Sequence, residues 1–154
     1  MSTPSDRDIV IETEPGRTAR ASRLLRAAGF YFAIVFGVGL LLGPPRALWL
    51  EPWLGKTLAV LCEMPFLIGA MWFGARAAPN WAGLRAGWAT LLGVGVIALV
   101  LQQIADLAVG FGLRSMTLAE QWAYFSTPPG YIYAFSLVLF ALMPLLRRQK
   151  ESGT

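Results

Sequence analysis

The sequence contains no histidine and only one cysteine, Cys62. Histidine is the commonest general base at physiological pH and the commonest metal ligand in proteins. Its absence excludes a Ser-His-Asp triad, a Cys-His pair and every histidine-ligated zinc site. A single cysteine also excludes a disulfide within the chain. We therefore expect no enzymatic activity, no catalytic residues, no cofactor and no metal site.

Charged residues are also scarce. They make up 14% of the 154 residues, whereas 56% are hydrophobic. A soluble domain has about 25% charged residues, so this chain has too little polar surface to stay in water. The charges cluster in residues 1–26 and 147–151, and the long apolar runs between them are typical of a membrane protein. Basic residues beside such runs set the orientation of transmembrane segments in the membrane. The net charge of +4 therefore does not predict a nucleic-acid partner.

Several apolar runs have the length of about 17–25 residues that a transmembrane helix needs. There are four of them, at residues 25–43, 57–75, 86–109 and 129–146. None shows the alternation of a barrel strand, and a helix satisfies every backbone group internally, as the bilayer requires. The sequence therefore predicts an all-α, integral membrane four-helix bundle over residues 24–147. Residues 1–23 are expected to form a mobile N-terminal tail, and residues 148–154 a C-terminal tail.

The distribution of lysine and arginine predicts the orientation of these spans. One side of the membrane would hold Arg7, Arg17, Arg20, Arg23, Arg26, Arg76, Arg85, Arg147, Arg148 and Lys150. The other side would hold only Arg46, Lys56 and Arg114. Because basic loops stay in the cytoplasm, both termini are expected there.

The two loops on the opposite, outer side contain signals for short helices. In "GPPRALWLEPWLGK", Trp49 and Trp53 would share one helical face and anchor at the level of the lipid headgroups. In "TLAE", Thr117 and Glu120 have the spacing of a capping box, which predicts a helix over about Leu118–Phe125. We expect both segments to lie on the outer membrane surface, with the lipid bilayer as their partner.

Polar residues inside the predicted spans mark a candidate site. Glu63 would lie about 10 Å below the outer edge of the second span, and Asp106 about 5 Å below that of the third. Gln102 and Asp106 are four residues apart and share a helix face, which Gly95 and Ala98 extend as a stripe suited to close helix contact. The candidate polar cluster comprises Arg46, Glu63, Gln102, Gln103, Asp106 and Arg114.

The sequence leaves the role of this cluster open. Ionisable groups inside a membrane by default mark a functional site. Glu63 and Asp106 could instead be structural, each neutralised by an arginine or a glutamine, or shallow enough to reach water. A wet binding pocket and proton or cation transfer are the functional alternatives. Pro65 would bend its helix beside Glu63 and favour a crevice there. We expect Arg46 to be the main partner of Glu63, because its loop leads directly into the second span.

Three short motifs carry a resemblance to a known family. They are "GPPR" at residues 43–46, "EMP" at 63–65 and "TPPG" at 127–130, which fit the patterns GP-x-R, E-x-P and TP-x-G. With these motifs, residues 24–147 resemble an uncharacterised family of small four-span bacterial inner-membrane proteins. The resemblance implies the topology and a location in the bacterial inner (plasma) membrane, and it implies no activity.

Two functions remain after these exclusions. The first is a non-enzymatic inner-membrane protein whose outer-leaflet polar cluster binds a small polar ligand, a lipid headgroup or a partner helix, either from another membrane protein or in a homo-oligomer. The alternative is a small transporter or proton-coupled carrier that uses Glu63 and Asp106. Many transporters contain internal repeats. The sequence of residues 24–75 is not convincingly repeated in residues 86–146. This comparison weighs against transport.

Overall fold

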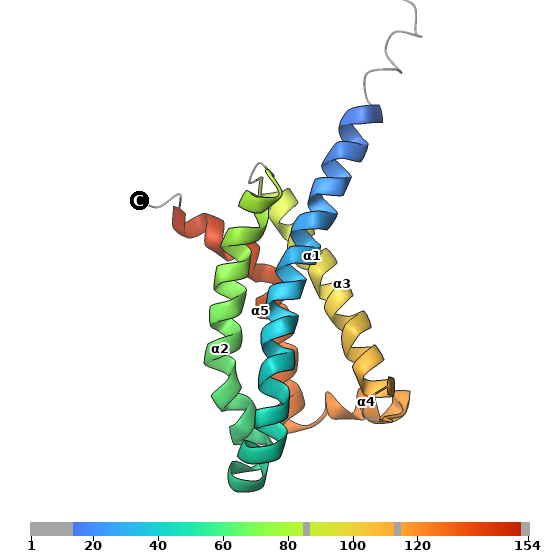
Figure 1. The fold of residues 1–154 in the computed structure, drawn as a ribbon, viewed down its shortest axis with the longest axis vertical. Coiled ribbons are helices and arrows are strands. Elements are labelled where there is room, and N and C mark those ends of the chain that lie inside the picture. The colour runs from blue at the N-terminus through green and yellow to red at the C-terminus, as the bar shows by residue number, and fades with distance from the viewer. Residues whose placement is uncertain (1–13, 85–86, 113–114, 152–154) are drawn as a thin grey trace, which may run out of the picture.

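The computed structural model describes residues 14–84, 87–112 and 115–151. Within these residues every regular element is a helix and there is no strand, as the sequence predicts. The long helices are α1 (Glu14–Pro45), α2 (Glu51–Trp81), α3 (Trp88–Gly112) and α5 (Pro128–Glu151). A π-helical turn, η1 (Arg46–Leu50), joins α1 to α2, and the short helix α4 (Leu118–Tyr124) lies between α3 and α5. Figure 1 shows the long helices side by side.

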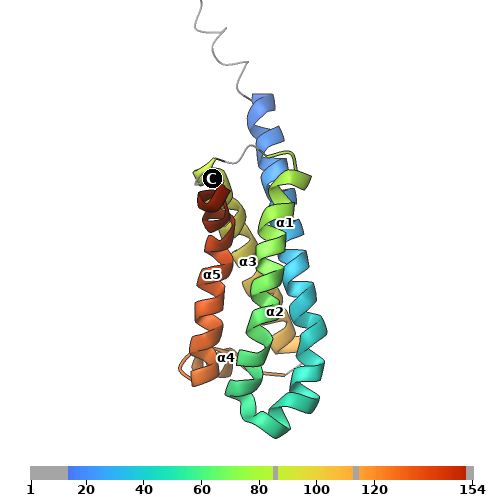
Figure 2. The same cartoon turned by 90° about the vertical axis from the view of Figure 1, so that its left-hand side faces the viewer.

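The long helices form a bundle in which α2 and α3 lie on opposite sides. Each of these two helices packs against both α1 and α5. The beginning of α1 and the end of α5 lie at the same end of the bundle, which we call the terminal end (Figures 1 and 2). The turn η1 and the helix α4 lie at the opposite end, which we call the α4 end.

Each long helix extends beyond the apolar run from which it was predicted. Helix α1 begins at Glu14 rather than near Leu25, so residues 14–23, which the sequence assigned to the N-terminal tail, are helical. Helix α5 likewise continues to Glu151. Apolarity marks only the part of a helix that suits hydrocarbon, whereas arginine, alanine and leucine in the flanks favour helix anywhere. The rest of both predicted tails, residues 1–13 and 152–154, lies outside the described residues.

The chain reverses between α1 and α2 without a separate loop. Pro44 and Pro45 come directly after the apolar run of residues 25–43, and both lie inside the last turn of α1. A proline supplies no N–H for the regular α-helical bond, and the chain continues as the wider π-helical turn. Residues 46–54 are helical up to a kink at Gly55, where two helices meet, so Trp49 and Trp53 lie in a short helical segment before that kink.

Gly55 completes this reversal. Its φ of 78° and ψ of 163° interrupt the helical dihedral angles inside α2, in a conformation that glycine adopts far more readily than other residues. Helices α1, η1 and α2 follow one another without an intervening loop, and together they contain the 66-residue stretch from Gly16 to Trp81. A straight helix of that length would be about 100 Å long, whereas Figure 2 shows α1 and α2 running antiparallel.

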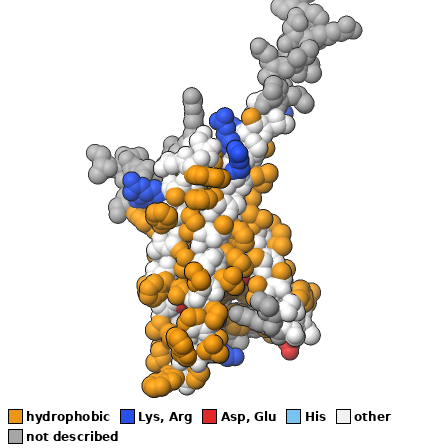
Figure 3. Space-filling view, viewed as in Figure 1, with side chains coloured by type: hydrophobic (Ala, Val, Ile, Leu, Met, Phe, Trp, Pro, Cys, Tyr) orange, Lys and Arg blue, Asp and Glu red, His pale blue; other side chains and the backbone are white. Residues whose placement is uncertain are grey.

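Three helical stretches of the described chain are long and apolar enough to cross a membrane. They are Gly16–Trp81, which contains the reversal, Trp88–Gly112 and Pro128–Arg147. Large apolar side chains on their outer faces are exposed, including Leu41, Phe66, Phe73, Ile104 and Phe135. Figure 3 shows apolar side chains covering the visible middle of the molecule, while basic side chains gather mainly at the terminal end. A surface this apolar indicates a membrane protein.

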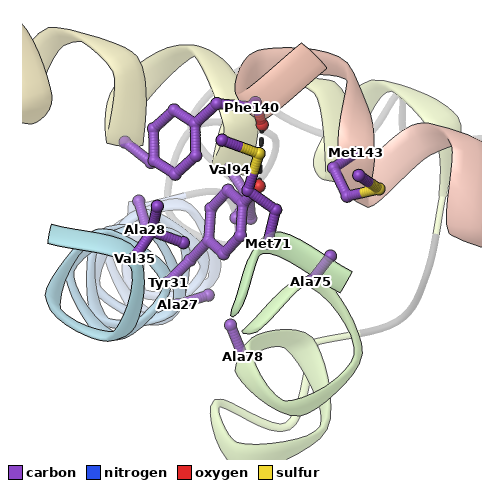
Figure 4. Close-up of a cluster of buried hydrophobic side chains, with 11 residues drawn as sticks. Ala27, Ala28, Tyr31, Val35, Met71, Ala75, Ala78, Val94, Phe140 and Met143 are labelled. Atoms are coloured by element: carbon purple, nitrogen blue, oxygen red, sulfur yellow. Dashed lines mark hydrogen bonds between the residues drawn. The ribbon is translucent and has the colours of Figure 1, made fainter. Parts of the chain in front are cut away.

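The core of the bundle centres on Tyr31 of α1. Its ring stacks on that of Phe140 at 4.6 Å between centroids, and its hydroxyl donates a hydrogen bond of 2.8 Å to the Phe140 carbonyl oxygen (Figure 4). This carbonyl has no regular helical donor, because the residue four positions later is Pro144, which lacks an N–H. Gly74 makes room for the ring, since a Cβ there would lie 2.9 Å from Tyr31 Cδ2.

Helices α3 and α5 approach closely at Gly95. A Cβ on Gly95 would collide with the Ala141 carbonyl group, and Ala98, one turn further along α3, is fully buried. The sequence predicted a close helix contact at these two residues, and the structure confirms it. This contact sets the rotation of α3, and therefore decides which neighbour Gln102 and Asp106 meet.

Candidate functional site

Glu63 of α2 is held by an arginine in η1, as the sequence predicted. Arg46 Nη1 lies 3.3 Å from Glu63 Oε2, and the two side chains are 19% and 10% exposed. A second carboxylate, Glu51 Oε1, lies 3.5 Å from Arg46 Nε. The reversal at η1 turns Arg46 back onto the first turns of α2, so one guanidinium contacts both acids. Charge-assisted pairing offsets the cost of placing Glu63 in an apolar helix.

Asp106 of α3 accepts hydrogen bonds from two neutral side chains. Gln102 Nε2 lies 3.0 Å from Asp106 Oδ1 and 3.1 Å from Oδ2. The hydroxyl of Tyr133, from α5, also donates to Asp106 Oδ2. The bond from Gln102 follows from the helical spacing of four residues. The bond from Tyr133 joins residues 27 positions apart, and it depends on how α3 packs against α5.

Helix α4 lies over this part of α3 and α5. Gln121 contacts the backbone of α3 at Gly110, where a Cβ would overlap the Gln121 amide group. The rings of Tyr124 and Phe125 contact the ring of Tyr133, at 6.3 and 5.8 Å between centroids. Gly110 and Asp106 lie one turn apart on α3, so Gln121 packs on α3 one turn beyond the carboxylate that Tyr133 binds.

The position of α4 is fixed at its start by the predicted capping box. The Thr117 hydroxyl accepts a hydrogen bond from the Glu120 backbone N–H, and the Glu120 carboxylate accepts one of 2.7 Å from the Thr117 backbone N–H. The hydrogen bonds from the Thr117 backbone and hydroxyl lower the pKa of Glu120, because they favour its ionised form. The helix covers Leu118–Tyr124, one residue shorter than expected.

The "TPPG" motif forms the turn from α4 into α5. The Thr127 hydroxyl donates to the Tyr124 carbonyl oxygen at 2.6 Å and accepts from the Gly130 N–H at 3.2 Å. A Cβ on Gly130 would collide with the Tyr124 carbonyl group. The motif therefore holds the end of α4 tightly against the start of α5, beside Tyr133.

Two amide atoms in this region are buried without a hydrogen-bond partner among the described residues. They are an acceptor, Gln102 Oε1, and a donor, Gln121 Nε2. Leaving a buried polar atom unsatisfied costs about 1–3 kcal/mol, and such atoms are rare in folded proteins. We call Gln102, Asp106, Gln121 and Tyr133 the α4 site. It combines a carboxylate and a free amide acceptor with a free amide donor.

The structure shows two sets of contacts within the predicted cluster. Glu63 lies with Arg46 at the junction of η1 and α2, and Gln102 lies with Asp106 on α3. Gln103 makes no hydrogen bond within the described part of the chain, because it points to a different face of α3 from Gln102. Arg114 lies outside the described residues.

Sequence reasoning did not select three residues of these sets, which are Glu51, Gln121 and Tyr133. Glu51 and Gln121 lie in the loops between the predicted spans, and Tyr133 is one of several aromatic residues in the fourth span. Gln121 and Tyr133 meet α3 from distant parts of the chain, so no spacing in the sequence identifies them. Glu51 lies five residues from Arg46, and the contact between them depends on the π-helical turn, which the sequence did not predict. Within the described residues, no three Cys, Asp or Glu side chains come together to hold a metal ion.

Comparison with known proteins assigns no family to this fold and its polar sites. No protein-family model, no curated protein and no solved structure matches the chain. The resemblance to four-span inner-membrane proteins therefore stays a prediction, and the chemistry of the side chains carries the functional interpretation.

Proposed function

We propose that this chain is a non-enzymatic four-span protein of the bacterial inner membrane that binds a small polar ligand at the α4 site. The α4 end would face the outer side, and both termini would lie in the cytoplasm. The observation that carries the proposal is a pair of buried amide atoms, Gln102 Oε1 and Gln121 Nε2, that have no hydrogen-bond partner among the described residues.

The chemistry of the site favours a ligand with a primary amine or ammonium group. Asp106 is an acceptor, and Gln102 donates its NH₂ group to Asp106, so Gln102 Oε1 also remains an acceptor. One ammonium group could donate to both oxygen atoms. Gln121 Nε2 would then donate to a hydroxyl or carbonyl oxygen of the same molecule. A charged donor suits a site with a carboxylate, because charge-assisted hydrogen bonds are the stronger ones.

The alternative of a proton-coupled carrier receives less support. Such a carrier would need Glu63 to bind and release a proton or cation. The ion pair of Glu63 with Arg46 instead supports a structural role for Glu63. We therefore place ligand binding at Asp106, and the stabilisation of the α1–α2 reversal at Glu63.

The membrane arrangement is supported by the reversal at Gly55 and by the distribution of charge. Antiparallel α1 and α2 would each cross the bilayer once, and α3 and α5 would complete four passes. We expect reporter fusions after Leu84 and after Thr154 to behave as cytoplasmic, and fusions after Gly55 and after Ser115 to behave as exported. Paired alkaline phosphatase and fluorescent-protein fusions would measure this. An exported signal after Leu84 would contradict the four-span arrangement.

Binding at the α4 site predicts a thermal shift with a simple amine. We expect methylammonium chloride, at about ten times its Kd, to raise the Tm of the purified protein in detergent by about 3 °C. Asp106→Asn and Tyr133→Phe should each abolish the shift. Gln103→Ala is the matched control and should retain it, because Gln103 makes no hydrogen bond in the described structure. Sodium chloride at the same concentration controls for ionic strength. An equal shift in wild type and Asp106→Asn would contradict the assignment.

A further inference from the structure

A second polar feature, separate from the α4 site, lies at the terminal end. A cleft of about 350 Å³ opens between α1 and the start of α3. Its lining consists of Arg17, Arg20, Ala21, Leu24, Ala89 and Thr90. We call it the arginine cleft. Arg20 Nη2 donates a hydrogen bond of 3.1 Å to Thr90 Oγ1, which ties the two helices together across the cleft.

The extension of α1 beyond its apolar run creates this cleft. Arg17, Ala21 and Leu24 follow each other at four and three residues, so they share one face of the helix. Leu24 packs at Gly93 of α3, where a Cβ would lie 3.6 Å from both Leu24 Cδ atoms. Thr90, one turn earlier on α3, is 7% exposed. This packing directs the arginine side chains of the same face towards the start of α3.

The charge of the arginine cleft is positive and not neutralised by its own lining. The lining contains two guanidinium groups and no carboxylate. Among the side chains that the structure describes, neither Arg17 nor Arg20 forms an ion pair. Among the described residues, the Thr90 hydroxyl contacts one nitrogen of Arg20, and a guanidinium carries further N–H donors in its planar fork that can bind an anion.

Two tryptophans indicate the depth of the cleft. Trp81 at the end of α2 and Trp88 at the start of α3 are 61% and 64% exposed. Exposed tryptophans at the ends of spans lie at the level of the lipid headgroups. Thr90 is two residues after Trp88, which is about 3 Å along the helix axis. The arginine cleft would therefore lie at the level of the lipid phosphates.

We propose that the arginine cleft binds the phosphate of an anionic phospholipid of the cytoplasmic leaflet. Arg17 and Arg20 would donate to the phosphate oxygens, in the bidentate geometry that guanidinium groups favour. The apolar side chains Ala21, Leu24 and Ala89 would contact the beginning of the acyl chains. This inference goes beyond the proposed ligand at the α4 site, and shares with it only the membrane arrangement.

The test measures lipid selectivity of the purified full chain in neutral detergent. Native mass spectrometry would give the apparent Kd for phosphatidylglycerol and for phosphatidylcholine with the same acyl chains. We expect wild type to prefer phosphatidylglycerol. Arg17→Gln and Arg20→Gln should each weaken its binding about five-fold, which is the contribution of one basic residue near an anionic surface. Binding of phosphatidylcholine should not change.

Arg76→Gln is the matched control. Arg76 is an exposed arginine five residues before the end of α2, but it does not line the arginine cleft, so its replacement should preserve the preference. An equal loss of binding in Arg76→Gln would show that diffuse charge attraction, and not the arginine cleft, selects the lipid. Equal binding of the two lipids by wild type would overturn the proposal outright.

Inorganic phosphate is the third probe. If it competes at equal concentration with phosphatidylglycerol, the site recognises free phosphate and not a lipid. Equal Tm values of all variants in phosphatidylcholine would confirm that the variants fold.

Discussion

Replacing Gly95 with alanine should destabilise the protein by about 3 kcal/mol, at the upper end of the range for overpacking. The added Cβ would collide with the Ala141 carbonyl group, which belongs to the backbone of α5 and cannot rotate away. Helices α3 and α5 would have to separate. Their separation would also break the contact between Asp106 and Tyr133. A denaturant titration in detergent micelles would measure the loss of stability.

Gly93→Ala is the control on the same helix. Its Cβ would lie 3.6 Å from Leu24, which is an ordinary van der Waals distance. Alanine also favours helix over glycine by up to about 1 kcal/mol, so this variant should be neutral or slightly stabilised. Both substitutions replace glycine with alanine on the same helix. Gly95→Ala should lower the free energy of unfolding, whereas Gly93→Ala should leave it unchanged or raise it slightly. Equal stability of Gly93→Ala and Gly95→Ala would show that α3 does not approach α5 at Gly95.

Replacing Glu63 with glutamine should cost about 2 kcal/mol or more, because it leaves the Arg46 guanidinium without its nearest carboxylate in a largely buried place. Both side chains keep a little exposure, 19% and 10%, so the loss should stay below that of a fully buried pair. Arg46→Gln should cost a similar amount, and the double variant should recover part of the loss. The free energies of unfolding in the double-mutant cycle would measure the coupling.

Glu51→Gln tests whether the loss of stability is specific to Glu63 or follows from removing either carboxylate that contacts Arg46. Glu51 contacts the same guanidinium at the longer distance of 3.5 Å, and its side chain is more exposed than that of Glu63, at 23% against 10%. Water therefore screens this pair more strongly. Its coupling to Arg46 should therefore be smaller than that of Glu63. A coupling between Glu63 and Arg46 below about 0.5 kcal/mol, the usual error of additivity, would refute the pairing.

The sequence by itself determined the helices and the contacts within them. The apolar runs predict the long helices, because in a membrane only a helix or a closed barrel satisfies every backbone group. The capping box of Thr117 and Glu120 and the contact of Gln102 with Asp106 span three and four residues, so helical geometry alone brings them together. The pairing of Glu63 with Arg46 could also be predicted, because a short reversal returns the chain directly to α2.

Only the tertiary structure decided the contacts between helices. The hydroxyl of Tyr31 meets the Phe140 carbonyl across 109 positions, and Arg20 meets Thr90 across 70. Such pairs depend on how far each helix is rotated about its axis, which apolarity does not specify when the surrounding lipid is as apolar as the core. Close packing at Gly74 and Gly95 fixes these rotations. For this reason Asp106 could be selected from the sequence, whereas its partner Tyr133 and the covering residue Gln121 could not.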